Sequence, residues 1–239
     1  EDSVSPDTLV IPSVGPAYGM MMDQATILRD SSFPTAMILP QREVCTFAGI
    51  ARAVRQFVDR FESPAVLYIK HDGFIDVDTV RGLMADGLLS WIKYAIVRDD
   101  PSEDAFLRDL VHAVGPVRVV SGIGEQPAIA HLRDFGVSSF TSGCVCIAPA
   151  LSMRMLRALQ QGQFDEAEQI RSTFRPLEDL RNQINPVRVL HTAVTASGIA
   201  DMGPLLPLMS DIDDADLVAS IRDAANELLQ QEAMAENEN

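Results

Sequence analysis

The sequence predicts an α/β fold in which helical crossovers connect the strands of a parallel sheet. Short apolar runs alternate with longer helical patterns, and most of the runs lack the alternation of a half-exposed strand. After the sixth run the sequence is helical to its end. Apolar residues make up 47% of the 239 residues, so the chain can bury a core as one large domain or two small ones.

Six apolar runs of five to seven residues are the predicted strands. Their continuous apolar character is typical of strands that are buried on both faces of a parallel sheet. They lie at 9–14, 35–39, 65–70, 91–97, 117–121 and 137–142.

Helical patterns lie between the later runs. Residues 47–61 place apolar side chains at spacings of mostly three and four, which is the stripe of an amphipathic helix. An aspartate at position 76 or 78 would cap a helix at 77–89, and Pro101 with the acids after it begins another. The expected helices are 47–61, 77–89, 101–113 and 127–134, followed by 152–160, 164–182, 186–195 and 214–232.

This pattern fits two architectures. One is an open doubly wound sheet, and the other is an eight-stranded (βα)₈ barrel whose first units lie upstream of Glu1. The C-terminal helices fit either an appended subdomain or an oligomer surface. The alternation of strands and helices does not decide between the open sheet and the barrel.

Charge and composition exclude several classes of partner. The net charge is −15, from 19 Lys+Arg and 34 Asp+Glu, which argues against a nucleic acid or an anionic membrane surface. No apolar run approaches the roughly 20 residues that span a bilayer. The four histidines lack the spacing of metal ligands, so we expect no metal.

The three cysteines are too few for a disulfide framework. Cys45, Cys144 and Cys146 are oddly spaced, and the last two would share one face of a strand. Buried, reduced thiols in a cytoplasmic protein are the simplest interpretation.

A lysine lies inside one apolar run, Trp91-Ile92-Lys93-Tyr94. A buried ammonium group is costly, so it is neutralised, paired or used in chemistry. A lysine with a lowered pKa is the usual amine for Schiff-base formation with a ketone. The alternative is a lysine at the rim of the strand with its ammonium group in solvent.

The preceding run adds Tyr68 and Lys70, which a period of two places on one face. In a cleft, the Tyr68 phenol could relay a proton. Lys70 could bind an anionic substrate group, or lower the pKa of Lys93 by like-charge repulsion if the strands are neighbours. The alternatives are a core aromatic residue and a cation on the surface.

Glycines follow the fifth run, in Ser121-Gly122-Ile123-Gly124. Glycine at the carboxyl end of a strand lets a ligand approach the backbone, although a tight turn is the alternative. Thr141 ends the sixth run and could line the same opening. Residues 15–19 do not match G-x-G-x-x-G, which disfavours a dinucleotide site.

In these motifs the chain resembles the dihydrodipicolinate synthase / N-acetylneuraminate lyase family. The runs VLYIK and WIKYA are similar to the family's tyrosine and Schiff-base lysine strands, with 93 − 68 = 25 residues between the two side chains. Ser121 to Gly124 is similar to its S-G-D/S-D motif. The segment GQFDEA at 162–167 is similar to its G-x-F/Y-x-x-A run.

The resemblance implies a TIM (β/α)₈ barrel with a C-terminal helical extension. Residues 9–14 fall on the family's third strand, so 1–150 would hold barrel units three to eight and 151–239 a helical region packed on the barrel. The first two βα units are then absent from this sequence. They carry the family's Thr-Thr/Ser-Gly-Glu motif, which binds the pyruvate carboxylate.

The resemblance also implies a class I lyase, aldolase or dehydratase without a cofactor. Lys93 would form a Schiff base with pyruvate or another 2-keto acid, Tyr68 would relay protons, and Gly122, Thr141 and Lys70 would bind the substrate. A cytoplasmic homo-oligomer, tetramer or dimer, is implied as well.

Departures from the family pattern leave other functions open. The family's arginine after the tyrosine strand is replaced by Lys70 or His71, which favours a different 2-keto acid such as a sugar acid. The missing motif suggests an alternative, an inactive barrel homologue with a binding or regulatory role. A third hypothesis is an open-sheet nucleotide-binding domain.

Overall fold

The structure is a computed structural model that describes residue 5 and residues 8–41 and 43–236. The chain divides into two compact units. The first comprises residues 1–122 and 134–138, and the second comprises residues 123–133 and 139–239.

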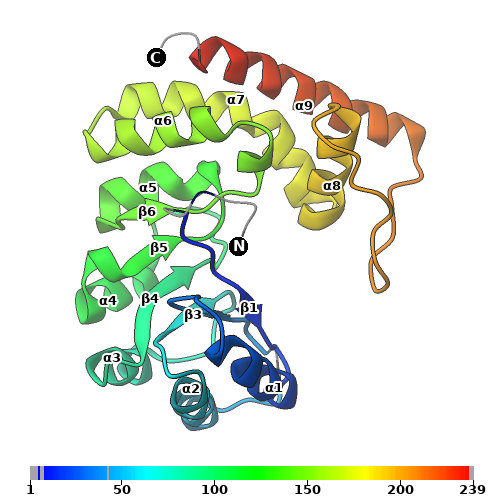
Figure 1. Cartoon of the computed structure of the whole chain (residues 1–239). Helices are drawn as coiled ribbons and strands as arrows, with labels where there is room; N and C mark the ends of the chain where they lie inside the picture. Colours follow the sequence, from blue (N-terminus) through cyan, green and yellow to red (C-terminus); the bar gives the residue numbers. More distant parts are fainter. Residues whose placement is uncertain (1–4, 6–7, 42, 237–239) are drawn as a thin grey trace. The chain divides into compact units, whose positions relative to one another are not determined.

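A parallel sheet forms the centre of the first unit. Its strands are adjacent in sequence order and every assigned pair is parallel, which confirms the predicted α/β fold (Figure 1). Each strand overlaps one of the predicted runs. The strands are β1 (Ser13–Val14), β2 (Met37–Ile38), β3 (Ala65–Ile69), β4 (Leu89–Tyr94) and β5 (Val119–Ser121), and β6 (Ser139–Phe140) in the second unit is last in the order.

Four helices accompany these strands in the first unit: α1 (Tyr18–Arg29), α2 (Phe47–Phe61), α3 (Val77–Ala85) and α4 (Ala105–Val114). The helix α2 begins where the Thr46 side chain accepts a hydrogen bond from the Gly49 N–H, and its apolar stripe is buried from Ile50 to Phe61. The sequence reasoning missed α1, whose N-terminus has no side-chain cap and whose methionine run shows no spaced stripe.

Several predicted helix boundaries were wrong. The helix α4 begins at Ala105, after its cap Asp104, and not at Pro101. Asp76 caps α3 by accepting a hydrogen bond from the Thr79 N–H at 2.7 Å, but the helix ends at Ala85 and not at residue 89. Gly87 has a φ of 72°, a left-handed conformation that ends helices and reverses the chain. Leu89 therefore begins β4, four residues before Lys93.

Helices make up most of the second unit, as the sequence predicts (Figure 1). Its core is formed by apolar side chains such as Met155, Phe174, Leu177 and Leu228, which are almost completely buried. The elements are α5 (Glu125–Phe135), a 3₁₀ turn (Cys144–Cys146), α6 (Pro149–Gln160), α7 (Phe164–Gln183), α8 (Pro186–Ala196) and α9 (Ala215–Glu236).

The prediction for the cysteines was wrong in two respects. Cys144 and Cys146 lie in a 3₁₀ turn and not on a strand, and only Cys144 is buried, whereas Cys45 and Cys146 are exposed. In the part of the chain that the structure describes, no group of His, Cys, Asp and Glu could hold a metal ion. None of the helices in that part is long and apolar enough to span a bilayer.

Candidate active site

Tyr68 and Lys93 lie opposite each other on neighbouring strands. The register of β3 against β4 pairs the two residues, and the Lys93 Nζ is 4.9 Å from the centre of the Tyr68 ring. Both side chains are half-buried. The two residues to which the sequence reasoning assigned chemistry therefore lie side by side on one face of the sheet.

The strand sequences determine this placement. On β3, Leu67 and Ile69 flank Tyr68 and are fully buried, while on β4 Ile92 and Tyr94 flank Lys93 and are fully buried. Because successive side chains of a strand point to opposite faces, these apolar neighbours orient both polar side chains towards the other face. That face is less buried, so it tolerates an amine and a phenol.

Gly122 packs directly against the aliphatic part of Lys93. It follows β5, and its N–H donates to the Tyr94 carbonyl oxygen at 2.6 Å. A Cβ atom at position 122 would lie 2.8 Å from both Cγ and Cε of Lys93, closer than real Cβ contacts come. The position of Lys93 thus depends on glycine at residue 122.

Lys70 directly follows β3 and is exposed. It lines a cavity of about 650 Å³ together with His71 and with residues 95–97, which follow β4. The cavity therefore opens at the carboxyl ends of the two strands that carry Tyr68 and Lys93. In open and closed parallel sheets, ligands bind at this edge.

Lysine is rare in this chain, a signal that the sequence reasoning overlooked. Lys70 and Lys93 are the only two lysines among 239 residues, and the other 17 of the 19 basic residues are arginines. Both lysines lie at the ends of adjacent strands. Any reaction that is specific for lysine side chains can therefore be assigned to one of two positions.

Thr141 belongs to the second unit, where it follows β6 and is half-buried. The structure thus brings together Tyr68, Lys93 and Gly122 and places Lys70 at the adjoining cavity. Thr141 lies in the second unit, and its role in the site stays a prediction.

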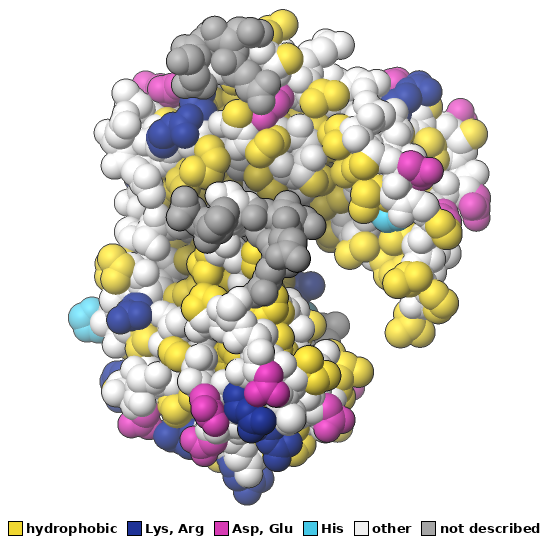
Figure 2. All heavy atoms as spheres, in the orientation of Figure 1, with side chains coloured by type: hydrophobic (Ala, Val, Ile, Leu, Met, Phe, Trp, Pro, Cys, Tyr) yellow, Lys and Arg dark blue, Asp and Glu magenta, His cyan; other side chains and the backbone are white. Residues whose placement is uncertain are grey.

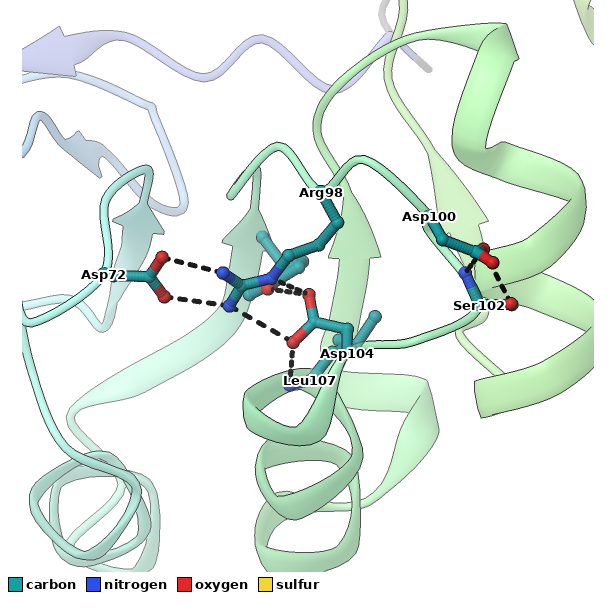
Figure 3. Close-up of polar contacts among 7 residues, drawn as sticks. Asp72, Arg98, Asp100, Ser102, Asp104 and Leu107 are labelled. Atoms are coloured by element: carbon teal, nitrogen blue, oxygen red, sulfur yellow. Dashed lines mark hydrogen bonds and ion pairs between the residues drawn. The ribbon is translucent and has the colours of Figure 1, made fainter.

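A polar network that the sequence reasoning also missed lies between the end of β4 and the start of α4 (Figure 3). The Tyr94 hydroxyl donates to Asp104, which is 1% exposed and caps α4 by accepting from the Leu107 N–H at 3.0 Å. Arg98 donates to the same carboxylate from Nε at 2.9 Å.

The charges of this network follow from its contacts. Burial, with Asp104 next to it, raises the pKa of Tyr94, so the phenol keeps its proton. Burial opposes ionisation of Asp104, but the hydrogen bonds from Arg98 and Tyr94 hold the pKa of Asp104 below its usual value. The network is therefore an ion pair between the buried Asp104 and the partly exposed Arg98, with a neutral phenol as a further donor.

The second unit contains a separate pair of buried carboxyl groups. Glu125 accepts hydrogen bonds from Ser142 at 2.6 Å and Ser152 at 2.8 Å, and its N–H donates to Glu178 Oε1 at 3.1 Å. Arg181 Nη1 is 4.0 Å from the same Glu178 oxygen. Glu178 Oε2 is buried without a hydrogen-bond partner within the described ranges.

Burial is the main reason why both carboxyl groups have raised pKa values. Removal from water, together with the negative charge of Glu125, raises the pKa of Glu178 to about 8. Burial raises the pKa of Glu125 as well. At neutral pH the pair therefore carries at least one proton.

Solved structures with a similar fold are numerous. No protein-family model matches the chain, and no curated protein matches it. The dihydrodipicolinate synthase from Oceanobacillus iheyensis superposes with a TM-score of 0.79 at 24% identity, over 95% of this chain and 74% of that one. The chain has the fold of the dihydrodipicolinate synthases. The predicted resemblance is thus confirmed at the level of the fold, which is α/β and TIM-barrel-like.

Two further structures share this fold and were solved with ligands. YagE, a prophage protein of the dihydrodipicolinic acid synthase family from E. coli K12 in complex with pyruvate, has a TM-score of 0.77 at 20% identity, over 97% of this chain and 78% of that one. PhdJ bound to a substrate intermediate has a TM-score of 0.81 at 16% identity, over 98% of this chain and 76% of that one.

Proposed function

We propose that this protein is a class I lyase of the dihydrodipicolinate synthase type, which forms a Schiff base between Lys93 and pyruvate or another 2-keto acid. The observation that carries the proposal is the 4.9 Å separation of the Lys93 Nζ from the Tyr68 ring, on adjacent strands of this fold. The pyruvate complex of YagE, which shares the fold, supports a keto acid as the substrate.

In the proposed reaction the neutral Lys93 amine attacks the keto carbon, and loss of water gives an imine. The protonated imine withdraws electrons from the neighbouring carbon, so that a C–C or C–O bond can be broken or formed there. Tyr68 relays the protons that the addition and the loss of water require.

Three residues are proposed to bind the substrate. Gly122 would bind the keto-acid carboxylate, and Lys70 would bind a second anionic group in the cavity. Thr141, in the second unit, is a substrate-binding residue that the family resemblance implies. The contact between residue 122 and the Lys93 side chain supports a role for Gly122, and the exposure of Lys70 at the cavity supports its role.

Trapping of the imine tests the proposal. The protein is incubated with each of a panel of 2-keto acids and borohydride, and its intact mass is measured. The wild type and Lys70→Arg are expected to gain the mass of one reduced adduct, whereas Lys93→Arg is not. A folded wild type that stays unmodified across the panel contradicts the proposal, and binding of pyruvate without trapping would indicate the inactive homologue.

We further propose a cytoplasmic homo-oligomer, a tetramer or a dimer. Large apolar side chains are exposed in the loop between α8 and α9, namely Met202, Leu206 and Leu208. Figure 2 shows hydrophobic side chains gathered at the tip of this loop, at the lower right of the second unit. Such a patch is typical of a protein–protein contact. The three free cysteines support the cytoplasmic location.

A further inference from the structure

One arginine connects the loops that follow β3 and β4. Arg98, after β4, donates from Nη1 and Nη2 to the two carboxylate oxygens of Asp72, after β3, at 2.7 and 2.8 Å. Through Nε the same guanidinium donates to Asp104 at the start of α4. Figure 3 shows the guanidinium between the two carboxylates.

The two ends of this bridge differ in burial. Asp104 is fully buried and fixed by Tyr94 and by the Leu107 N–H, so it anchors the guanidinium to the body of the unit. The side chain of Asp72 is 65% exposed. The inner contact therefore orients Arg98, and the outer contact transmits that orientation to the loop after β3. Two parallel hydrogen bonds restrain both distance and plane, which a single ion pair does not.

The bridged loops line the cavity at the carboxyl ends of β3 and β4, whose lining includes Lys70 but not Lys93 or Tyr68. Residues 70–74, Asp72 among them, line one wall, and residues 95–97, which precede Arg98, line another. The bridge thus fixes the separation of the walls at the carboxyl ends of β3 and β4. The guanidinium is itself committed to the two carboxylates and does not line the cavity.

We propose that Arg98 is a positioning residue for the substrate: through Asp72 it holds the wall of Lys70 and His71 at a fixed distance from the β4 side of the cavity. This inference rests on the proposed function and adds to it a residue that acts through others. Loss of the bridge weakens substrate binding, whereas Lys93 and Tyr68, on the strands themselves, keep their geometry.

The outer contact is tested first because Asp72 is exposed and its loss is compatible with folding. In Asp72→Ala we expect KM for the 2-keto acid to rise about tenfold, the scale of one binding contact, with kcat within about twofold of wild type. Arg98→Lys keeps the charge but not the paired hydrogen bonds, and should shift KM in the same direction. The control is Asp86→Ala, which removes a similarly exposed partner of Arg55 at the end of α3 and should change neither constant.

Hydrogen exchange gives a readout that does not require activity. Asp72→Ala should increase amide exchange in residues 70–76, and Asp86→Ala should not. Faster exchange in a protein that turns over no keto acid supports the bridge while the proposed function fails. Unchanged KM with unchanged exchange overturns the inference, as does a loss of kcat at constant KM, because the bridge would then act on the reacting groups.

Discussion

Glu178 is expected to make the stability of the second unit depend on pH. Its carboxyl group is fully buried, and burial with the negative charge of Glu125 raises the pKa of Glu178 to about 8, from 4.5 in an exposed glutamate. The folded state therefore binds a proton that the unfolded state releases between these two values. The contribution of Glu178 to the free energy of unfolding must fall as the pH rises from about 4.5 through 8.

The size of the effect follows from the two pKa values. A rise from 4.5 to about 8 corresponds to about 5 kcal/mol of stability, which is fully present below pH 4.5 and lost above about pH 9. The variant Glu178→Gln keeps a similar shape and an oxygen that can accept from the Glu125 N–H, but it does not titrate. The difference in unfolding free energy between the variant and the wild type should therefore grow by about 4 kcal/mol between pH 5 and pH 9.

Urea unfolding of wild type and variant, followed by circular dichroism at intervals from pH 5 to pH 9, measures this difference. Glu227→Gln, at an exposed position of α9, is the matched control and should run parallel to the wild type. Because Glu125 and Glu178 titrate as a pair, the pH dependence that remains in Glu178→Gln reports Glu125 without the charge of its neighbour. Parallel curves for Glu178→Gln and wild type would refute the reasoning.

Three further substitutions test the site and the fold. Gly122→Ala places a Cβ atom against Lys93 and should lower kcat/KM by about 100-fold, as expected for a misplaced reacting group. The control is Gly82→Ala, whose added Cβ atom meets no atom within 4 Å and should leave activity intact; equal activity of the two variants would contradict the packing argument. Tyr68→Phe should lower kcat by about 100-fold and still form the trapped adduct, and an unchanged kcat would remove Tyr68 as the proton relay. Asn185→Ala removes the side chain that accepts hydrogen bonds from the N–H groups of Val187 and Arg188 at the start of α8. The free energy of unfolding in urea should fall by about 1 kcal/mol, and a fall below about 0.3 kcal/mol would count against the cap.

The sheet could be predicted because short, mostly continuous apolar runs alternate with helical patterns, which is typical of a parallel sheet with helical crossovers. The pairing of Tyr68 with Lys93 was expected from the resemblance of their two runs to a known family, because alternation gives the face of each strand but not the register between strands. By contrast, α1 has neither a capping side chain nor a regular apolar stripe, so no local signal indicated it. The early start of β4 depended on the backbone conformation of Gly87.

Contacts between distant residues were beyond the reach of sequence patterns. Glu125 and Glu178 are 53 residues apart, and nothing in either segment indicates that their carboxyl groups share a buried site. Asp72 and Arg98 look like ordinary surface charges until the register of β3 and β4 brings their loops together. Cys144 and Cys146 have the spacing of a strand face but occupy a turn, because a two-residue interval does not specify the backbone conformation.

Peptide mapping of the trapped adduct tests the central assignment most directly. Cleavage after arginine separates the two lysines, with Lys70 in peptide 61–81 and Lys93 in peptide 82–98. After treatment with pyruvate and borohydride, the added mass should lie on peptide 82–98 alone. Mass on peptide 61–81, or on neither peptide of a folded protein, would contradict the assignment of the reacting amine to Lys93.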